Sequence, residues 1–127
     1  MMIHGIGTDI IEVNRFQKLS ERFMERCFTD LERQYLAGKG PESIAGYFAA
    51  KEAVVKALGT GFAGFWPSAV EICRGSSGKP VVKLHGVAAE VAEANRIVSV
   101  EVSISHCKSV AMAMAIIVKA DSAAGME

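Results

Sequence analysis

The chain has 127 residues, 50% of them hydrophobic, and its 14 lysine and arginine side chains balance 14 acidic ones. This length predicts a single domain with its own core. The balanced charge argues against a disordered chain and against a strongly basic nucleic-acid-binding protein.

The sequence also lacks signals for insertion into a membrane or for secretion. The longest apolar run, Val110 to Val118, is too short to span a bilayer, and the first residues do not resemble a signal peptide. Cys27, Cys73 and Cys107 are scattered, which predicts reduced thiols in the cytoplasm. Neither these cysteines nor the three histidines are spaced as zinc ligands.

The N-terminal part predicts a short strand followed by helix. Met2 to Gly7 alternates loosely and is predicted as a strand that ends at Thr8 and Asp9. Apolar residues recur at helical spacing from Glu12 to Cys27, and because Ser20 could cap a second segment, the pattern fits one helix or two short ones. On a single helix, basic side chains would form a stripe, either a solvated face or a surface for an acidic partner. They are Arg15, Lys18, Arg22 and Arg26.

The next segment predicts a capped helix and a loop. Thr29 and Glu32 have the spacing of a capping box, which predicts a helix that ends near Leu36. Lys39 to Ser43, which contains Pro41, is predicted as a loop.

The following helix, from Tyr47 to Leu58, carries the strongest signal. Its apolar residues recur at helical spacing, and Gly59 is predicted to end it in a left-handed conformation. Glu52 and Lys56 lie one turn apart on another face. They are either a solvated pair that contributes roughly 0.2–0.5 kcal/mol or part of a functional site.

The segment from Gly59 to Gly64 matches the pattern G-x-G-x-x-G. We reject a dinucleotide-binding function, because that fingerprint leaves a strand and opens a helix, whereas this segment follows a helix. It is either a flexible loop or a turn whose backbone N–H groups approach a phosphate.

The second half of the chain predicts mainly strands. They are expected at Val70 to Arg74, Pro80 to Leu84, Val98 to Ser105 and Val110 to Val118, with a helix at Val87 to Asn95. The last strand is apolar enough to be buried on both faces. Helices come first and hairpins last, so the expected fold class is α+β with an antiparallel sheet. The domain is expected to span residues 1–119, and residues 120–127 to be a flexible tail.

Few side chains could carry chemistry. Ser105 and His106 are neighbours on a predicted strand, so they point to opposite faces and cannot act together as nucleophile and base.

Asp9 alone suits a helix cap. If Asp9 and Glu52 meet in space, they suit Mg²⁺, which takes one or two protein carboxylates and completes its shell with waters and phosphate oxygens. Lys56 beside them would place a positive charge on a phosphate.

Four motifs, in order and over about Ile3 to Val118, resemble the holo-[acyl-carrier-protein] synthase family. They are Gly5-Ile6-Gly7-Thr8-Asp9-Ile10-Ile11-Glu12; Phe48-Ala49-Ala50-Lys51-Glu52-Ala53 with Lys56-Ala57-Leu58-Gly59-Thr60-Gly61; Gly78-Lys79-Pro80; and Val102-Ser103-Ile104-Ser105-His106.

The resemblance implies a 4′-phosphopantetheinyl transferase fold that assembles as a homotrimer with active sites between subunits. It implies a magnesium-dependent transfer of 4′-phosphopantetheine from coenzyme A to a serine of apo-acyl carrier protein, which releases adenosine 3′,5′-bisphosphate and supports fatty acid biosynthesis. Asp9 and Glu52 match the magnesium ligands, and Lys56 completes the expected catalytic set. Expected coenzyme A contacts are Lys56, Gly59, Thr60, Gly61, Lys79, Pro80 and His106, and expected carrier contacts are Arg15, Arg22 and Arg26.

One position departs from the family pattern. Many relatives have arginine just before Phe48, where this chain has Tyr47. If that arginine holds a phosphate of coenzyme A, either another Lys or Arg replaces it or nucleotide binding is weaker. The attacking serine belongs to the partner, and its proton could go to Asp9, Glu52 or a metal-bound water.

Two other functions stay open at this point. A transferase of relaxed specificity would load carrier domains of polyketide or peptide synthases, and the short chain favours the fatty-acid type instead. A non-catalytic module would bind coenzyme A or a carrier without transfer, and the presence of Asp9, Glu52 and Lys56 speaks against it. No nucleic-acid or membrane partner is expected.

Overall fold

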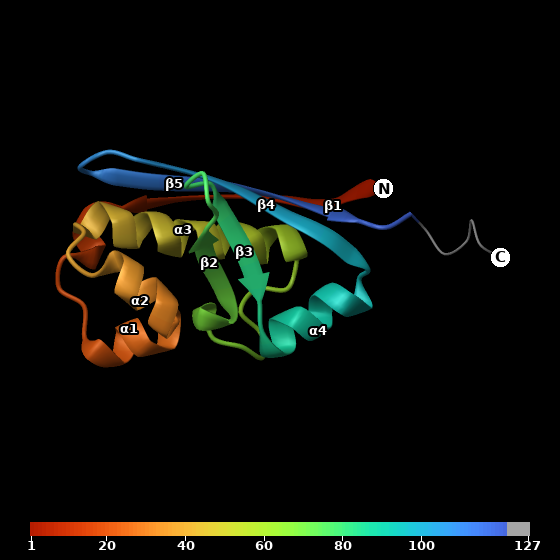
Figure 1. Ribbon diagram of the computed structural model, residues 1–127, viewed down its shortest axis with the longest axis horizontal. Coiled ribbons are helices and arrows are strands. Elements are labelled where there is room, and N and C mark those ends of the chain that lie inside the picture. Colours follow the sequence, from red (N-terminus) through yellow and green to blue (C-terminus); the bar gives the residue numbers. More distant parts are fainter. Residues whose placement is uncertain (122–127) are drawn as a thin grey trace.

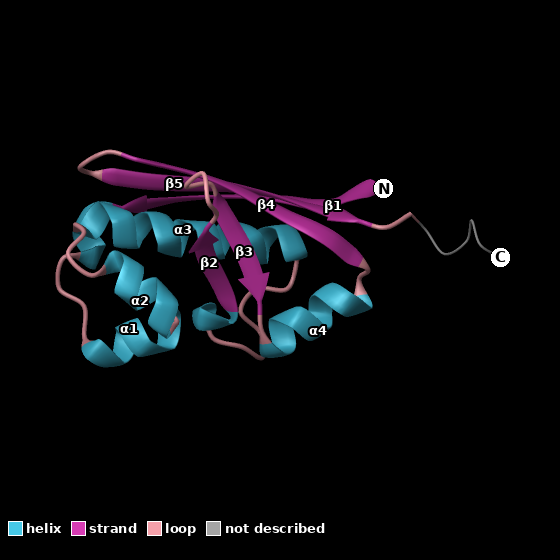
Figure 2. Cartoon of the chain, in the orientation of Figure 1, coloured by secondary structure: helices cyan, strands magenta, loops and turns pink. Residues whose placement is uncertain are grey.

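A computed structural model of the chain describes residues 1–121 and confirms the α+β class (Figure 1). Its elements are β1 (Met2–Glu12), the 3-10 helix η1 (Val13–Phe16), α1 (Glu21–Cys27), α2 (Asp30–Leu36), α3 (Pro41–Leu58), η2 (Pro67–Ala69), β2 (Val70–Arg74), β3 (Pro80–Leu84), α4 (Gly86–Ala94), β4 (Ile97–His106) and β5 (Val110–Lys119). The long strands run along one side of the molecule, α3 lies along them, and α1, α2 and the β2–β3 hairpin cover the other side of α3 (Figure 2).

The strands form two antiparallel sheets, which confirms the predicted antiparallel pairing. One is three-stranded, in the order β1-β5-β4, and the other is the two-stranded hairpin β2-β3. The hairpin has the predicted bounds, and the ends of α4, β4 and β5 lie within one residue of the predicted ones. Turn residues and strict alternation are local signals, so these elements could be located from the sequence.

β1 is longer than predicted. It does not end at Thr8 and Asp9 but continues to Glu12, and it pairs with β5 along its length apart from an irregularity between Ile3 and Gly5. Asp9 therefore lies inside a strand, opposite Ala113, and the interpretation of Asp9 as a helix cap is wrong. Pairing with β5 supplies the backbone hydrogen bonds of this segment, which the local sequence pattern does not reveal.

The contact between β1 and α3 depends on two glycines. A Cβ atom at Gly5 would lie 2.0 Å from the carbonyl oxygen of Ala57, and one at Gly7 would lie 1.9 Å from that of Ala53. No side chain fits at these distances, so the strand backbone lies directly against the helix backbone. Because alternate residues share a face of a strand, Asp9 points toward α3 as the two glycines do.

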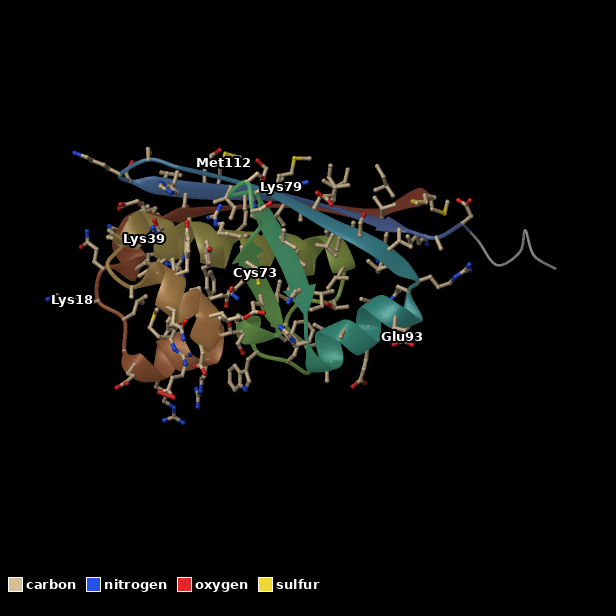
Figure 3. All side chains as sticks on the ribbon, viewed as in Figure 1. Lys18, Lys39, Cys73, Lys79, Glu93 and Met112 are labelled. Carbon is tan, nitrogen blue, oxygen red and sulfur yellow. The ribbon has the colours of Figure 1, made fainter. Side chains whose placement is uncertain are left out.

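The outer face of the three-stranded sheet is apolar and uncovered in the single chain. On β1, Ile6 and Ile10 are 57% and 72% exposed, and on β5, Met112 and Met114 are 46% and 39% exposed. Figure 3 shows Met112 on the side of the sheet away from α3. The expectation that β5 is buried on both faces is therefore wrong within one chain, where only its inner residues such as Ala113 are covered.

The segment between β1 and α2 forms two short pieces rather than one helix. η1 ends at Phe16, and Ser20 caps α1 by accepting a hydrogen bond from the backbone N–H of Phe23 at 3.0 Å. Of the two patterns that the sequence allowed, the broken one is therefore right. The basic stripe assumed a continuous helix, so the structure does not support it as a single face.

α2 and α3 begin and end through local signals, with one correction. The capping box at Thr29 and Glu32 is present, and Gly59 ends α3 at φ 85° as predicted. The predicted loop at Lys39 to Ser43 is wrong in its second half, because Pro41 is the first residue of α3. Proline suits that position, where a backbone N–H has no helical partner.

A fully buried ion pair joins α2, α3 and β2. The ammonium group of Lys51 donates to both carboxylate oxygens of Glu32 at 2.8 Å and to the carbonyl oxygen of Val70 at 2.6 Å. The same carboxylate accepts hydrogen bonds from the backbone N–H groups of Thr29 and Ile72. Each buried charge thus has several partners, which is what keeps such a pair from destabilising the fold.

The predicted tail at 120–127 falls partly outside the described residues, since the structure does not describe 122–127. The backbone N–H of Ala120 donates to the carbonyl oxygen of Arg96 at 2.9 Å, and the carboxylate of Asp121 pairs with the N-terminal amine. Within residues 1–121, no helix combines the length and the apolar character that crossing a membrane requires.

Candidate active site

Asp9 and Lys56 form the centre of the site. Lys56 reaches from α3 to β1, where its ammonium group lies 3.2 Å from a carboxylate oxygen of Asp9 and donates to the carbonyl oxygen of Thr8 at 2.9 Å. The side chain of Asp9 is 15% exposed and that of Lys56 is 54% exposed. The contact is thus open to solvent on the lysine side, while the strand and the helix shield the acid.

Glu52 lies one helical turn before Lys56 and close to Asp9. Partial burial raises the pKa of Glu52, and the negative charge of Asp9 raises it further, against the opposing effects of Lys56 and Arg15. A carboxyl group whose pKa is raised by burial and by a neighbouring carboxylate is a common feature of metal and catalytic sites. The structure therefore brings together Asp9, Glu52 and Lys56, with Lys56 paired to Asp9 rather than to Glu52 alone.

Arg15 belongs to this site rather than to a common face with Arg22 and Arg26. Arg15 lies on η1, and its positive charge opposes the rise in the pKa of Glu52. Arg22 and Arg26 lie on α1. The break in the chain at Ser20 separates the two groups. The three arginines remain expected carrier contacts, but from two different elements.

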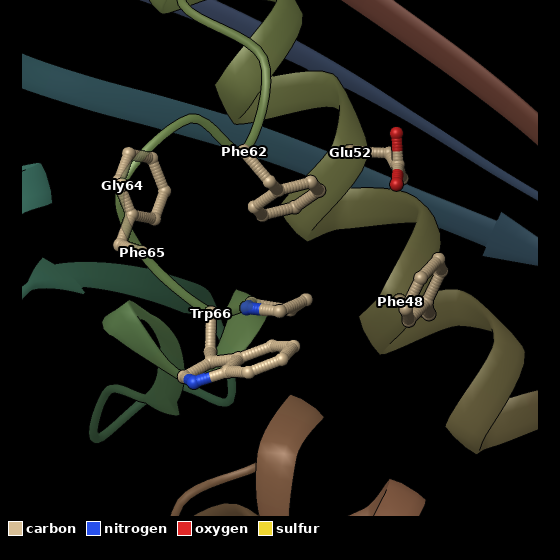
Figure 4. Close-up of a pocket in the computed structure, with 7 residues that line it drawn as sticks. Phe48, Glu52, Phe62, Gly64, Phe65 and Trp66 are labelled. Atoms are coloured by element: carbon tan, nitrogen blue, oxygen red, sulfur yellow. The ribbon is translucent and has the colours of Figure 1, made fainter.

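An apolar hollow adjoins Glu52 (Figure 4). It has a volume of about 470 Å³ and is lined by Phe48 and Glu52 of α3 and by residues that follow the glycine-rich turn. Phe62, Phe65 and Trp66 are the aromatic residues among them, and Trp66 is 59% exposed. The sequence analysis missed these side chains, although three aromatic residues close together after a glycine-rich turn were a visible signal.

The glycine-rich turn lies at the C-terminal end of α3. Gly59 and Gly61 have φ values of 85° and 62°, and Thr60 donates from its hydroxyl to the carbonyl oxygen of Gly61 at 2.8 Å. The backbone N–H of Gly59 is bonded to the carbonyl oxygen of Val55 and caps the helix. The glycine-rich turn therefore begins three residues after Lys56. Its first N–H group, that of Gly59, is used to cap the helix.

A second hollow, of about 370 Å³, gathers the remaining predicted coenzyme A contacts. Lys79 and Pro80 of the hairpin face His106 of β4 across it, and Arg74 of β2, which sequence reasoning missed, lines it as well. This hollow shares no lining residue with the one at Glu52. The predicted contacts thus form two groups within one chain.

The acid pair fits the magnesium ion that the resemblance implies. Within residues 1–121, no three His, Cys, Asp or Glu side chains gather as metal ligands, so an all-protein cage is excluded there. Asp9 and Glu52 are two carboxylates at a partly exposed position, which matches an ion that keeps several waters and takes phosphate oxygens.

Comparisons with known proteins point to one family. The model of the 4′-phosphopantetheinyl transferase superfamily matches residues 5–115. The holo-[acyl-carrier-protein] synthase of Alkaliphilus metalliredigens is 50% identical over 120 residues, which cover 91% of this chain and 98% of the relative. That of Caldicellulosiruptor bescii is 48% identical over 119 residues, with 91% and 98% covered.

Solved structures of the same family share the fold. A holo-(acyl-carrier-protein) synthase from Bacillus anthracis, in complex with CoA (3′,5′-ADP), is 38% identical, with a TM-score of 0.78 over 94% of this chain and 100% of that one. The enzyme from Neisseria meningitidis is 33% identical, with a TM-score of 0.83 over 93% and 100% of the chains.

Proposed function

This chain belongs to the 4′-phosphopantetheinyl transferase superfamily, among the holo-[acyl-carrier-protein] synthases, and we propose that it performs their reaction. It transfers 4′-phosphopantetheine from coenzyme A to a serine of apo-acyl carrier protein, with adenosine 3′,5′-bisphosphate as the second product. The reaction takes place in the cytoplasm and supports fatty acid biosynthesis. The supporting observation is the joint position of Asp9, Glu52 and Lys56 beside an open hollow.

The metal that we propose is Mg²⁺, held by Asp9 and Glu52. When bound, it would neutralise charge on the pyrophosphate of coenzyme A and polarise the phosphorus that is attacked. Asp9 is fixed by its strand and by the ion pair with Lys56, so the acid needs little reorganisation to bind a cation.

Lys56 has a separate role at the phosphates. It is held by Asp9 and by the carbonyl oxygen of Thr8, and its exposed side chain offers a positive charge at the open side of the site. Such a charge stabilises the negative charge that develops on the leaving bisphosphate. The chain supplies no nucleophile, because the attacking oxygen belongs to the serine of the carrier.

The apolar hollow at Glu52 leads toward α1, where we place the carrier. A neighbouring hollow, lined by Arg22 and Arg26 of α1, shares Trp66 and Pro67 with the hollow at Glu52. The guanidinium group of Arg26 lies 4.8 Å from the centre of the Trp66 ring. A carrier docked on α1 would therefore present its serine along an aromatic wall that ends at Glu52.

We propose a homotrimer with active sites between subunits, built on the outer face of the three-stranded sheet. Three features support it: the exposed apolar residues of β1 and β5, the absence of a cover within residues 1–121, and the absence of Lys56 and the glycine-rich turn from the hollow that holds the other expected coenzyme A contacts. Apolar faces of this kind are usually covered by another subunit.

The test of the reaction is direct. The protein is incubated with coenzyme A, Mg²⁺ and a purified apo-acyl carrier protein, and the carrier is weighed by mass spectrometry. We expect the mass of one 4′-phosphopantetheine group to be added, and the addition to require the metal. A carrier that keeps its mass while the protein binds coenzyme A would instead identify a non-catalytic binding module. Carrier domains of polyketide and peptide synthases, tested in parallel, measure specificity.

A further inference from the structure

Arg74 at the end of β2 is held by two stacked tyrosines. The rings of Tyr35 and Tyr47 lie parallel, with centres 5.5 Å apart, and the guanidinium carbon of Arg74 lies 5.2 Å and 5.3 Å from those centres. Its Nε donates to the hydroxyl of Tyr47 at 3.1 Å, and one terminal nitrogen donates to the carbonyl oxygen of Gly78 at 3.2 Å. The orientation of the guanidinium group is thus fixed before any ligand binds.

Tyr47, a residue of the core, orients Arg74 through its hydroxyl. It is buried, and burial raises the pKa of its hydroxyl against the opposing effect of Arg74. The neutral hydroxyl accepts the hydrogen bond that orients Arg74.

Arg74 lines a hollow that is suited to an anion. Lys79 and His106 line it together with Arg74, and no carboxylate lines it. The ammonium group of Lys79 pairs with Glu101 at 3.0 Å, an exposed contact that an incoming anion can displace at little cost. Planar, fixed guanidinium groups bind phosphate through two parallel hydrogen bonds.

We propose that Arg74 binds the phosphate on the ribose of coenzyme A. The assignment rests on the proposed function. Coenzyme A carries a pyrophosphate, which must lie at Asp9, Glu52 and Lys56, and one remote phosphate, on the 3′ oxygen of its ribose. A cationic hollow that shares no residue with the reaction site matches the remote phosphate.

Steady-state kinetics with coenzyme A and with 3′-dephospho-coenzyme A test this assignment. For Arg74→Ala we expect the KM for coenzyme A to rise about tenfold to a hundredfold, the range expected for lost hydrogen bonds to a charged group. With 3′-dephospho-coenzyme A, the wild-type protein and Arg74→Ala should have equal KM values, because the phosphate in question is missing. Lys83→Ala, an exposed cation on the same hairpin outside this hollow, should behave as the wild type.

Two results would overturn the assignment. One is an unchanged KM for coenzyme A in Arg74→Ala, and the other is an equal loss with both substrates. Either result is distinct from failure of the proposed function, in which the wild-type protein itself transfers nothing. If Arg74→Ala does not fold, Tyr47→Phe can be used instead, because it removes only the hydroxyl that orients Arg74. Its KM for coenzyme A should rise several-fold, and its KM for 3′-dephospho-coenzyme A should not change.

Discussion

Gly7 of β1 lies so close to Ala53 of α3 that a Cβ on the glycine would stand 1.9 Å from the alanine carbonyl oxygen. This contact places the strand that carries Asp9 against the helix that carries Glu52. The backbone contact therefore sets the spacing of the two acids, because Gly7 lies two residues before Asp9 and Ala53 lies one residue after Glu52.

Gly7→Ala should separate the acids and destabilise the fold. The three atoms nearest to the added methyl group are backbone atoms of Ala53 and Ala57, so it can be accommodated only if the strand moves. We therefore expect a loss of about 1–3 kcal/mol in unfolding free energy and at least a hundredfold lower transfer rate. Urea unfolding and the mass assay measure the two effects. Gly75→Ala is the control, since its nearest neighbours lie at 3.5 Å. A Gly7→Ala protein with full activity would contradict the role given to this contact.

Glu52→Gln should abolish transfer and make the protein more stable at neutral pH. Burial and Asp9 raise the pKa of Glu52 in the folded state, so ionisation opposes folding, and stability falls as pH rises from the unfolded pKa through the folded one. The glutamine variant avoids this loss. Its melting temperature should exceed that of the wild type at pH 7 and approach it at acidic pH, where Glu52 is protonated. Glu90→Gln on α4 should show neither effect, and normal turnover of Glu52→Gln at saturating Mg²⁺ would reject the metal assignment.

Removal of the metal should have a matching effect. Transfer should stop in excess chelator and return when Mg²⁺ is added in excess, while the fold persists, because Lys56 still neutralises Asp9. Circular dichroism and the mass assay, run on the same samples, distinguish loss of metal from loss of structure. Activity that persists through exhaustive chelation would rule out the proposed cofactor.

Lys51→Met should be strongly destabilising although Lys51 touches no substrate. The change leaves the carboxylate of Glu32 buried without its cation, and such losses amount to about 3–5 kcal/mol. Denaturant unfolding measures the loss. In the double variant with Glu32→Gln, part of the stability should return, because a neutral amide oxygen can still accept the hydrogen bond from Ile72. Lys51→Met with wild-type stability would show that the pair is not needed for the fold.

Arg22→Glu should raise the KM for the carrier about tenfold or more and leave coenzyme A binding unchanged, because Arg22 lies on α1, away from Glu52. Arg15→Glu should lower the turnover rate instead, since Arg15 acts on Glu52. The effect of Arg22 should weaken as salt rises. Lys83→Glu is the control for added negative charge, and an unchanged carrier KM in Arg22→Glu would remove this arginine from carrier recognition.

Met114→Glu should convert the proposed trimer to monomers and abolish transfer. The side chain lies on the outer face of the central strand, where a buried carboxylate would find no partner. Analytical ultracentrifugation gives the mass in solution. Val87→Glu changes an exposed apolar residue of α4 instead and should leave the mass unchanged. A wild-type protein that is monomeric and active would contradict the trimer.

The sequence by itself determined the elements whose signals are local. The hairpin around Gly75 and Gly78, the capping box at Thr29 and the left-handed end of α3 at Gly59 all follow from turn chemistry and periodicity within a few residues. The catalytic candidates Asp9, Glu52 and Lys56 also came from the sequence, through residue type, helical spacing and family motifs.

Only the tertiary structure decided which distant groups meet. It showed that Asp9 lies within a strand, that Lys51 is buried against Glu32, and that Arg74 donates a hydrogen bond to the hydroxyl of Tyr47. It also showed that β5, whose apolar composition predicts burial on both faces, exposes Met112 and Met114 in the single chain. The physical reason is that these contacts join residues far apart in the sequence: Lys51 and Glu32 are 19 positions apart, and Arg74 and Tyr47 are 27 apart. They depend on how the elements pack, which no local pattern along the chain encodes.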